Sequence, residues 1–394
     1  MSSPAATGQS PAGSKSRPDF ERIALLLQGG GALGSYQAGV YEALAEVGLQ
    51  PDWVAGISIG SINAALIAGN PVEKRVDRLR EFWETVTAPP LGIPYLASYE
   101  VKDETQRMLV NQWRATMGIL YGAPNFFFPR LPPPMLPTAQ PSALSYYDTG
   151  PLKALLERLV DFDRINSRET RFSVGAVNVK TGNFIYFDNT THTIRAEHVM
   201  ASGALPPGFP AVEIDGEFYW DGGTVSNTPL QWVIDSRPRF DTLAFQVDLW
   251  SARGPLPRNM VEVDVRTKDL RYSSRTRAGT DTFRRSQALR RAAARLLEQM
   301  PESLRQTAEA ELLAQEADQK VYNIIHLIYR SQRYESVTKD YEFSRLSMEE
   351  HWKSGYADME HTLAHPEVLQ RPTSADGVFT FDLAMQGRHP EKKP

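Results

Sequence analysis

Two short apolar runs open the patterned part of the chain, and a helical pattern follows each of them. Ile23–Leu27 and Trp53–Ile57 have the length and composition of buried strands. Apolar residues then recur at steps of three and four, first from Leu33 to Val47 and again over Ser61–Ala68. Strands that alternate with helices in this way predict an α/β domain with parallel strands.

The pattern changes twice before residue 250. Residues 88–150 are crowded with proline and hold Phe126-Phe127-Phe128, so we expect an irregular insertion with exposed aromatics, more simply a surface loop than a lipid-facing lid. A helix is expected over Asp148–Val160, followed by a last strand at Thr242–Trp250. Two hairpins are expected between them, with turns at Thr181-Gly182-Asn183 and at Asp215-Gly216.

The remainder of the chain is mainly helical in pattern. We expect a linker over 251–279, a C-terminal domain over 280–385 and a tail over 386–394. Within that domain, Val321–Tyr329 is typical of a strand, and Ser347 begins a capping box that opens a helix. Five arginines with interleaved leucines between 283 and 297 suit either a helix packed on the core or one lying on an anionic bilayer, and the first is favoured. The acidic segment after them could form a hairpin with those arginines.

Composition narrows the class of protein. Apolar residues make up 41% and charged residues 23% of the 394 positions, which is typical of a folded globular chain. The net charge of −4 weighs against a nucleic-acid partner. There is no cysteine, so disulfides, thiolate metal sites and a cysteine nucleophile are excluded.

Targeting signals are weak in this chain. Residues 1–20 are rich in Ser, Pro, Ala and Gly and lack the apolar stretch of a signal peptide, so we expect a disordered leader. No apolar run approaches the roughly 20 residues of a membrane-spanning helix. We therefore expect a cytoplasmic protein, and contact with a membrane surface and homo-oligomerisation are left open.

Gly56-Ile57-Ser58-Ile59-Gly60 is a G-x-S-x-G sequence placed between a predicted strand and a predicted helix. That context is the one a nucleophile elbow requires, because the sharp turn presents the serine hydroxyl above the sheet. The following helix directs its positive end towards Ser58. A passive serine in a glycine-rich turn is the competing interpretation at this point.

The glycine loop after the first strand admits two interpretations. Gly29, Gly31 and Gly34 satisfy G-x-G-x-x-G, the dinucleotide fingerprint. The acidic residue that should follow the second strand is absent there, because Ser58 takes that place. A loop of consecutive glycines before a helix also exposes backbone N–H groups that can stabilise an oxyanion. Acyl transfer is thus favoured over hydride transfer.

A serine nucleophile needs a base. None of the seven histidines has a local signature, although a distant triad member such as His198 stays open. Asp221 closes a predicted strand and enters Gly222-Gly223, so its carboxylate could approach a serine. On composition alone an ordinary turn aspartate is the commoner interpretation.

Taken together, the ordered segments Gly29–Gly34, Gly56–Gly60 and Asp221–Gly223 resemble the patatin-like phospholipase family. Ala201–Pro210 resembles the stretch that leads into the third motif of that family. The resemblance covers about residues 21–250, the expected catalytic domain. The segment around 339–345 is similar to an extra C-terminal domain of some bacterial members, which could complete the fold, mediate dimers or line the substrate tunnel.

The resemblance implies a three-layer α/β/α fold with a mostly parallel central sheet, and a Ser–Asp dyad without histidine. Ser58 would be the nucleophile and Asp221 the proton acceptor, flanked by the motif glycines Gly56, Gly60, Gly222 and Gly223. The oxyanion hole would come from the loop Gly29, Gly30, Gly31, Ala32, Leu33 and Gly34. The family often has a cation where Leu33 stands, so here the hole would rest on backbone donors alone.

The resulting prediction is a metal-independent serine hydrolase that cleaves phospholipid, lysophospholipid or other fatty-acyl esters through an acyl-enzyme. No metal or cofactor motif is present in the sequence. The alternatives are an acyltransferase on the same dyad and a non-catalytic lipid-binding scaffold.

Overall fold

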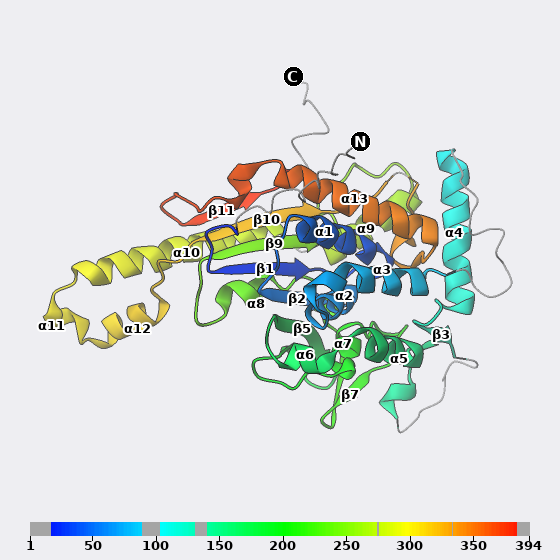
Figure 1. The fold of residues 1–394 in the computed structure, drawn as a ribbon, viewed down its shortest axis with the longest axis horizontal. Helices are drawn as coiled ribbons and strands as arrows, with labels where there is room; N and C mark the ends of the chain where they lie inside the picture. The colour runs from blue at the N-terminus through cyan, green and yellow to red at the C-terminus, as the bar shows by residue number, and fades with distance from the viewer. Residues whose placement is uncertain (1–16, 89–102, 131–139, 274–275, 333, 384–394) are drawn as a thin grey trace, which may run out of the picture.

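A central, mostly parallel β-sheet with helices on both faces organises the molecule (Figure 1). The computed structural model describes residues 17–88, 103–130, 140–273, 276–332 and 334–383. Most of the expected leader and the whole expected tail lie outside these residues. The predicted fold class, a three-layer α/β/α arrangement with a mainly helical C-terminal region, is confirmed.

Within the described residues the main sheet has nine strands in the order β11-β10-β9-β1-β2-β5-β8-β7, with β6 paired to β5. The strands from β11 to β5 run parallel, and β6, β7 and β8 join antiparallel. Their bounds are β1 (Arg22–Leu27), β2 (Trp53–Ile57), β5 (Arg171–Asn178), β6 (Phe184–Asp188), β7 (Val212–Ile214), β8 (Glu217–Asp221), β9 (Thr242–Asp248), β10 (Tyr322–Ile328) and β11 (Val378–Phe381). A small separate sheet pairs β3 (Phe128–Pro129) with β4 (Tyr147–Asp148).

The described residues form helices between and after the strands. They are α1 (Ser35–Glu46), α2 (Ile59–Ala68), α3 (Arg75–Val86), α4 (Glu104–Tyr121), α5 (Gly150–Leu159), α6 (Phe162–Asn166), α7 (Ala196–Ser202), α8 (Leu230–Asp235), α9 (Met260–Tyr272), α10 (Thr276–Gln299), α11 (Glu302–Arg305), α12 (Ala308–Glu316) and α13 (Arg345–Leu363). Short 3₁₀ turns are η1 (Gly31–Gly34), η2 (Val72–Lys74), η3 (Pro141–Ala143), η4 (Gly222–Thr224), η5 (Lys339–Tyr341) and η6 (Pro366–Leu369). Among these residues no helix is both long enough and apolar enough to cross a bilayer.

Both faces of the sheet are buried, as β1 illustrates. Ile23, Leu25 and Leu27 join the larger apolar core with α1, α2, α3 and α13. Ala24 and Leu26 point to the opposite face, where α8 and α10 cover them. A strand covered on both sides must be apolar at every position, which explains the unbroken run in the sequence.

The C-terminal region is built into the same sheet. β10 pairs in parallel with β9 over seven positions, and β11 pairs with β10. α13 packs along α1, where the glycines Gly39 and Gly355 let the two helix backbones come close. The division of the chain near residue 250 stays a prediction, and the expected linker over 251–279 contains α9.

Two local expectations are wrong. The insertion over 88–150 contains the 18-residue helix α4, because the prolines lie outside Glu104–Tyr121. Phe126 and Phe127 are buried, with tilted ring contacts to Phe209 and edge-on contacts to Phe343, and only Phe128 of the three is exposed.

The last helix also begins earlier than its capping box predicted. Its N-cap is Ser344, whose hydroxyl accepts a hydrogen bond from the N–H of Ser347. Ser347 therefore lies inside the first turn, because an N-cap serine binds an N–H about three residues further on.

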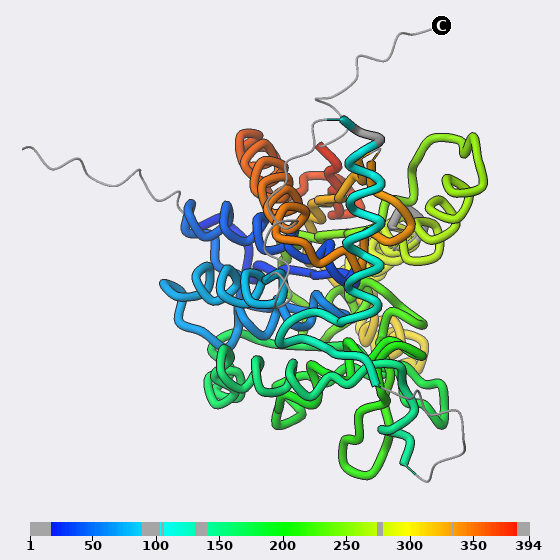
Figure 2. Tube along the Cα trace, turned by 90° about the vertical axis from the view of Figure 1, so that its right-hand side faces the viewer, coloured from blue at the N-terminus to red at the C-terminus, as the bar shows by residue number. Residues whose placement is uncertain are grey.

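The two ends of the molecule differ in shape. α4 stands at one end, beside the small sheet (Figures 1 and 2). At the other end α10, α11 and α12 extend beyond the sheet as a helical hairpin, coloured yellow in Figure 1. We call residues 285–316 the arm.

Candidate active site

Ser58 occupies a sharp turn between β2 and α2. Its backbone φ of 54° is left-handed, which is rare for a residue with a side chain and is a form of strain that clusters at functional sites. The turn is possible because Gly60 approaches β1 closely: a Cβ there would lie 2.2 Å from the carbonyl oxygen of Leu27. The half-buried Ser58 side chain is thereby presented at the carboxyl end of the sheet.

The pairing of β5 brings Asp221 to Ser58. Gly175 on β5 pairs with Ile57, the last residue of β2, and the next residue, Ala176, pairs with Asp221 at the end of β8. Ile57 and Asp221 lie more than 150 residues apart in sequence, yet they pair with neighbouring residues of β5. Ser58 and Asp221 line the same cavity, and interaction with the Ser58 hydroxyl lowers the pKa of the Asp221 carboxylate.

Burial makes Asp221 more basic than an ordinary aspartate. Only 1% of its surface is exposed. Desolvation raises its pKa to about 7, against the opposing effects of hydrogen bonds from the Ser58 hydroxyl and the Gly223 N–H. The Gly223 N–H lies 2.7 Å from Oδ1 and fixes the orientation of the carboxylate. Asp221 therefore changes its charge close to neutral pH.

Some backbone N–H groups of the glycine loop beside Ser58 donate hydrogen bonds within the protein, and others have no recorded acceptor. The Gly29 N–H donates to the Asn227 carbonyl at 3.4 Å, and the Leu33 N–H donates to the Gly30 carbonyl at 3.2 Å. The first N–H groups of a helical turn have no partner within it. Gly30 and Gly31 line the same cavity as Ser58, whereas the Leu33 side chain is buried in the core.

Polar residues that sequence reasoning missed hold this loop in place. The Asn227 side-chain amide donates to the carbonyl oxygens of Gly29 and Tyr272, at 3.1 and 2.9 Å. The Trp250 indole N–H donates to the Gly29 carbonyl at 2.8 Å. Gln28 accepts hydrogen bonds from the N–H groups of Leu249 and Trp250. Asn227 could have been found as a polar residue four positions beyond the Gly222-Gly223 turn, but nothing local marks Trp250 or Gln28.

The C-terminal region touches the glycine loop directly. Gly31 has a φ of 55°, and a Cβ there would lie 2.1 Å from the carbonyl oxygen of Asp340. Lys268 on α9 forms an ion pair with Asp340 and lies near the face of Trp250. Segments from both halves of the chain thus set the position of this loop.

A cavity of about 630 Å³ opens beside Ser58. Its volume is within the range typical of small-molecule sites. Its walls are mostly apolar and come from α2, α4, the small sheet, the 203–209 segment and the 340–343 segment, and they include Ile59, Ile62, Ile119, Phe126, Phe127, Tyr146, Tyr147, Leu205, Phe209, Trp250, Tyr272, Tyr341 and Phe343. Gly29, Gly30, Gly31, Ser58 and Asp221 lie on its wall.

Histidine is placed elsewhere among the described residues. His198, on α7, accepts a hydrogen bond from the Arg195 N–H and packs on Phe187, and burial lowers its pKa to about 4. His351 hydrogen-bonds to the buried Glu335. His326 is buried in β10. None of the recorded contacts of these rings is with Ser58 or Asp221.

The other motif residues surround the pair. Gly56 is the second-last residue of β2, next to the elbow, and Gly222 packs against β5. Ala32 and Gly34 belong to η1 but do not line the cavity. Across the described part of the chain, no group of three or more metal-ligating side chains comes together.

Comparison with known proteins identifies the family of this chain. A family profile described as patatin-like phospholipase matches residues 25–234, and a second, described as patatin phospholipase, matches residues 270–375. Patatin-like phospholipase domain-containing protein 6 from mouse and from human is 43% identical over 77 residues. The match spans 18% of this chain and 6% of the length of those relatives.

Among solved structures, VipD from Legionella pneumophila is similar with a TM-score of 0.40 and 14% identity, over 93% of this chain and 72% of that one. The first family profile alone covers more than half of the sequence, and its matched range contains both Ser58 and Asp221. The prediction made from the three motifs is confirmed: the chain belongs to the patatin-like phospholipase family.

Proposed function

We propose that this chain, a lipid hydrolase by its family, cleaves fatty-acyl esters with Ser58 as nucleophile and Asp221 as proton acceptor. One observation carries the proposal: Ser58 and the buried Asp221 carboxylate, whose pKa the Ser58 hydroxyl lowers, line the same large and mostly apolar cavity. A carboxylate with a pKa near 7 is a far better base for a serine than an exposed aspartate with a pKa of about 3.9.

In the acylation step the Ser58 oxygen attacks the ester carbonyl carbon while its proton passes to Asp221. The carbonyl electrons move to the oxygen and form a tetrahedral oxyanion. Collapse of this intermediate breaks the bond to the alcohol, which leaves with the proton that Asp221 held. The acyl group remains bonded to Ser58.

Deacylation repeats the cycle with water. Asp221 accepts a proton from water as the water oxygen attacks the acyl-enzyme carbonyl. Collapse of the second intermediate releases the fatty acid and returns the proton to Ser58. No charged group other than Asp221 is needed to move protons in this scheme.

We assign stabilisation of the oxyanion to the Gly30 and Gly31 N–H groups. Both lie on the cavity wall and have no protein acceptor among the recorded hydrogen bonds, whereas those of Gly29 and Leu33 are occupied. A donor fixed before the reaction contributes more than one that must reorient. Asn227 and Trp250 fix this loop through the Gly29 carbonyl, so we regard them as positioning residues.

The apolar lining supports a long acyl chain as the group that enters the cavity. The rim is apolar as well: Ile119 and Tyr146 line the cavity and are also about half exposed. Leu120, Tyr121 and Leu144 are exposed nearby in sequence. We propose that this rim rests on a lipid surface, so that a substrate enters without passing through water.

The test is labelling of the purified chain with a fluorescent fluorophosphonate, read by intact mass. We expect one adduct on the wild type, none on Ser58→Ala, and strongly slowed labelling of Asp221→Asn. An adduct on Ser58→Ala would overturn the assignment of the nucleophile. Product analysis with an added alcohol then separates hydrolysis from acyl transfer, since a transferase would divert the acyl group from water.

A further inference from the structure

The arm presents apolar side chains that nothing in the described structure covers. On α10, Leu289 and Leu296 are 72% and 54% exposed, and they follow one another at the seven-residue spacing of a coiled-coil stripe, with Ala292 between them. Leu312 and Leu313 on α12 and Leu304 on α11 are exposed as well. Isolated exposed leucines are ordinary, but five on one small hairpin concentrate apolar exposure in this part of the molecule.

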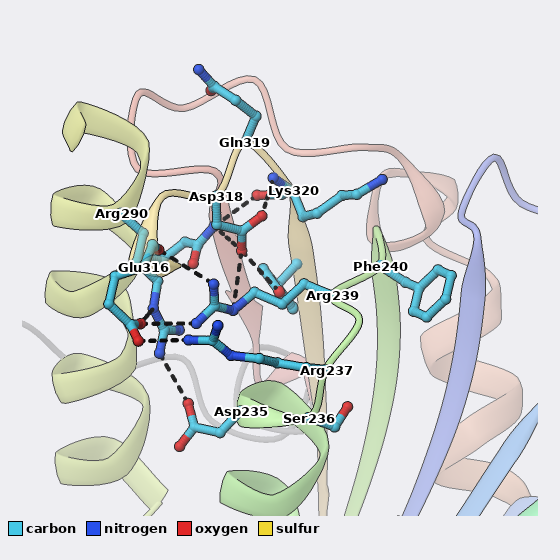
Figure 3. Close-up of polar contacts among 12 residues, drawn as sticks. Asp235, Ser236, Arg237, Arg239, Phe240, Arg290, Glu316, Asp318, Gln319 and Lys320 are labelled. Atoms are coloured by element: carbon cyan, nitrogen blue, oxygen red, sulfur yellow. Dashed lines mark hydrogen bonds and ion pairs between the residues drawn. The ribbon is translucent and has the colours of Figure 1, made fainter. Parts of the chain in front are cut away.

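The base of the arm is tied to the body by ion pairs (Figure 3). Glu316, at the end of α12, binds Arg237 and Arg239, and Arg290 on α10 binds Asp235. Asp318, just beyond α12, accepts hydrogen bonds from Gln287 and from the Tyr322 hydroxyl. Both helices of the hairpin are therefore fixed where they leave the sheet, so the leucines are held outward on a supported framework.

Charge is divided unevenly along the arm. Residues 285–316 contain five arginines and five glutamates, so the arm is neutral overall. Four of the arginines lie on α10, and three of the glutamates lie on α12. Arg290 and Glu316 are paired within the same copy, whereas Arg285 and Arg295 on α10 and Glu309 and Glu311 on α12 are exposed. A neutral arm has little attraction for an anionic bilayer, which binds helices with an excess of basic residues. A hairpin with one basic and one acidic helix is instead complementary to a second copy of itself.

We propose that the arm is a dimerisation element: the arms of two copies pack face to face about a two-fold axis. In this arrangement α10 of one copy lies along α12 of the other, so that the leucines are buried in a four-helix contact and the opposite charges meet at its edges. The same patch serves both partners, as in most symmetric dimers. The proposal does not depend on the proposed function.

The position of the arm is compatible with catalysis in both copies. The arm and α4 lie at opposite ends of the molecule, and Ile119 of α4 lies on the cavity wall (Figure 1). A dimer built through the arms therefore leaves the cavity rim of each copy free.

The first experiment measures the mass of the full chain in solution by sedimentation equilibrium. We expect a dimer in the micromolar range for the wild type, and at least a roughly 100-fold weaker dimer for Leu296→Glu combined with Leu312→Glu. Both leucines are exposed in one copy, so the fold is retained, which far-UV circular dichroism checks. Leu256→Glu is the matched control, because Leu256 is 89% exposed but lies outside the arm.

A second experiment uses the absence of cysteine from the sequence. A single thiol introduced by Leu296→Cys is expected to give a cross-linked dimer with a short bismaleimide, and Leu256→Cys is expected to give none. A wild type that stays monomeric at about 100 µM would overturn the proposal. So would a dimer that survives the double glutamate substitution, or a monomer whose arm leucines are needed to float with phosphatidylserine vesicles.

Discussion

The cavity end and the arm end of this molecule both carry apolar and charged side chains, but in different surroundings. At the cavity, Asp221 is almost completely buried, and desolvation raises its pKa to about 7. At the arm, Arg295 and Glu309 are exposed, where water screens each charge. A single polar group can therefore decide the chemistry at the cavity, whereas association at the arm depends on the summed apolar area and on many weak charge contacts.

The largest loss of activity is expected from Ser58→Ala at the cavity. Loss of the nucleophile should lower the rate of ester hydrolysis at least about 1,000-fold, because no other group can form the acyl-enzyme. Turnover of a chromogenic fatty-acyl ester measures it. Ser142→Ala, which removes an exposed hydroxyl, is the matched control and should leave the rate unchanged. Hydrolysis retained by Ser58→Ala would show that the cavity acts through another residue.

Asp221→Asn should lower the rate by a similar order while increasing stability at alkaline pH. The pKa of Asp221 is raised in the folded protein, so its ionisation destabilises the fold as the pH rises through about 7. The neutral amide avoids that effect, and the free energy of unfolding above pH 8 should increase by roughly 1–4 kcal/mol. Chemical denaturation at pH 5 and pH 8.5 measures it. An equal effect at both values would contradict the buried charge.

The raised pKa of Asp221 also predicts how the rate of the wild-type protein depends on pH. The proton acceptor must be ionised, so kcat/KM should rise about tenfold per pH unit below about 7 and level off above it. The increase should be absent from the residual activity of Asp221→Asn. A plateau that extends down to pH 5 would mean that the acceptor has an ordinary carboxyl pKa.

Gly31→Ala tests the contact between the glycine loop and the C-terminal region. The added methyl group meets the Asp340 carbonyl in a left-handed backbone, so the loop must move, and we expect kcat to fall roughly 10- to 1,000-fold. Gly182→Ala is the matched control, since Gly182 has a φ of 71° with open space around it. It should cost only about 1 kcal/mol of stability. Equal activity in the two variants would exclude the loop from catalysis.

The smallest effect on activity is expected at the arm. Leu296→Glu with Leu312→Glu should change the sedimentation mass while the rate of fluorophosphonate labelling stays within about twofold of the wild type, because the arm lies at the end opposite α4. A large loss of labelling would show that the two ends are coupled.

Ser58 and Asp221 were candidates because both lie in glycine-rich turns that follow predicted strands, and the resemblance to the patatin-like family singled them out as a pair. Their meeting could not be derived from either motif, since it depends on the register of β5 with β2 and β8. The strands of the parallel sheet were predictable because burial on both faces leaves unbroken apolar runs, as in Ile23–Leu27.

The parts that were missed depend on contacts between distant segments. Trp250 and Asp340 reach the glycine loop from more than 200 residues away, and no local pattern marks such a contact. α4 was hidden by the prolines on either side of it, which dominate the composition of the insertion. Phe126 and Phe127 were expected to be exposed because their partners, Phe209 and Phe343, are remote in sequence.

The contact between Gly31 and Asp340 also has a consequence for the order of events during synthesis. The ribosome makes the glycine loop about 300 residues before the Asp340 segment that packs against it. A nascent chain that already contains Ser58 and Asp221 still lacks Tyr341 and Phe343 on the cavity wall. Under the proposed mechanism, ester cleavage is therefore expected to begin only after the 340–343 segment has been synthesised and has packed against the glycine loop.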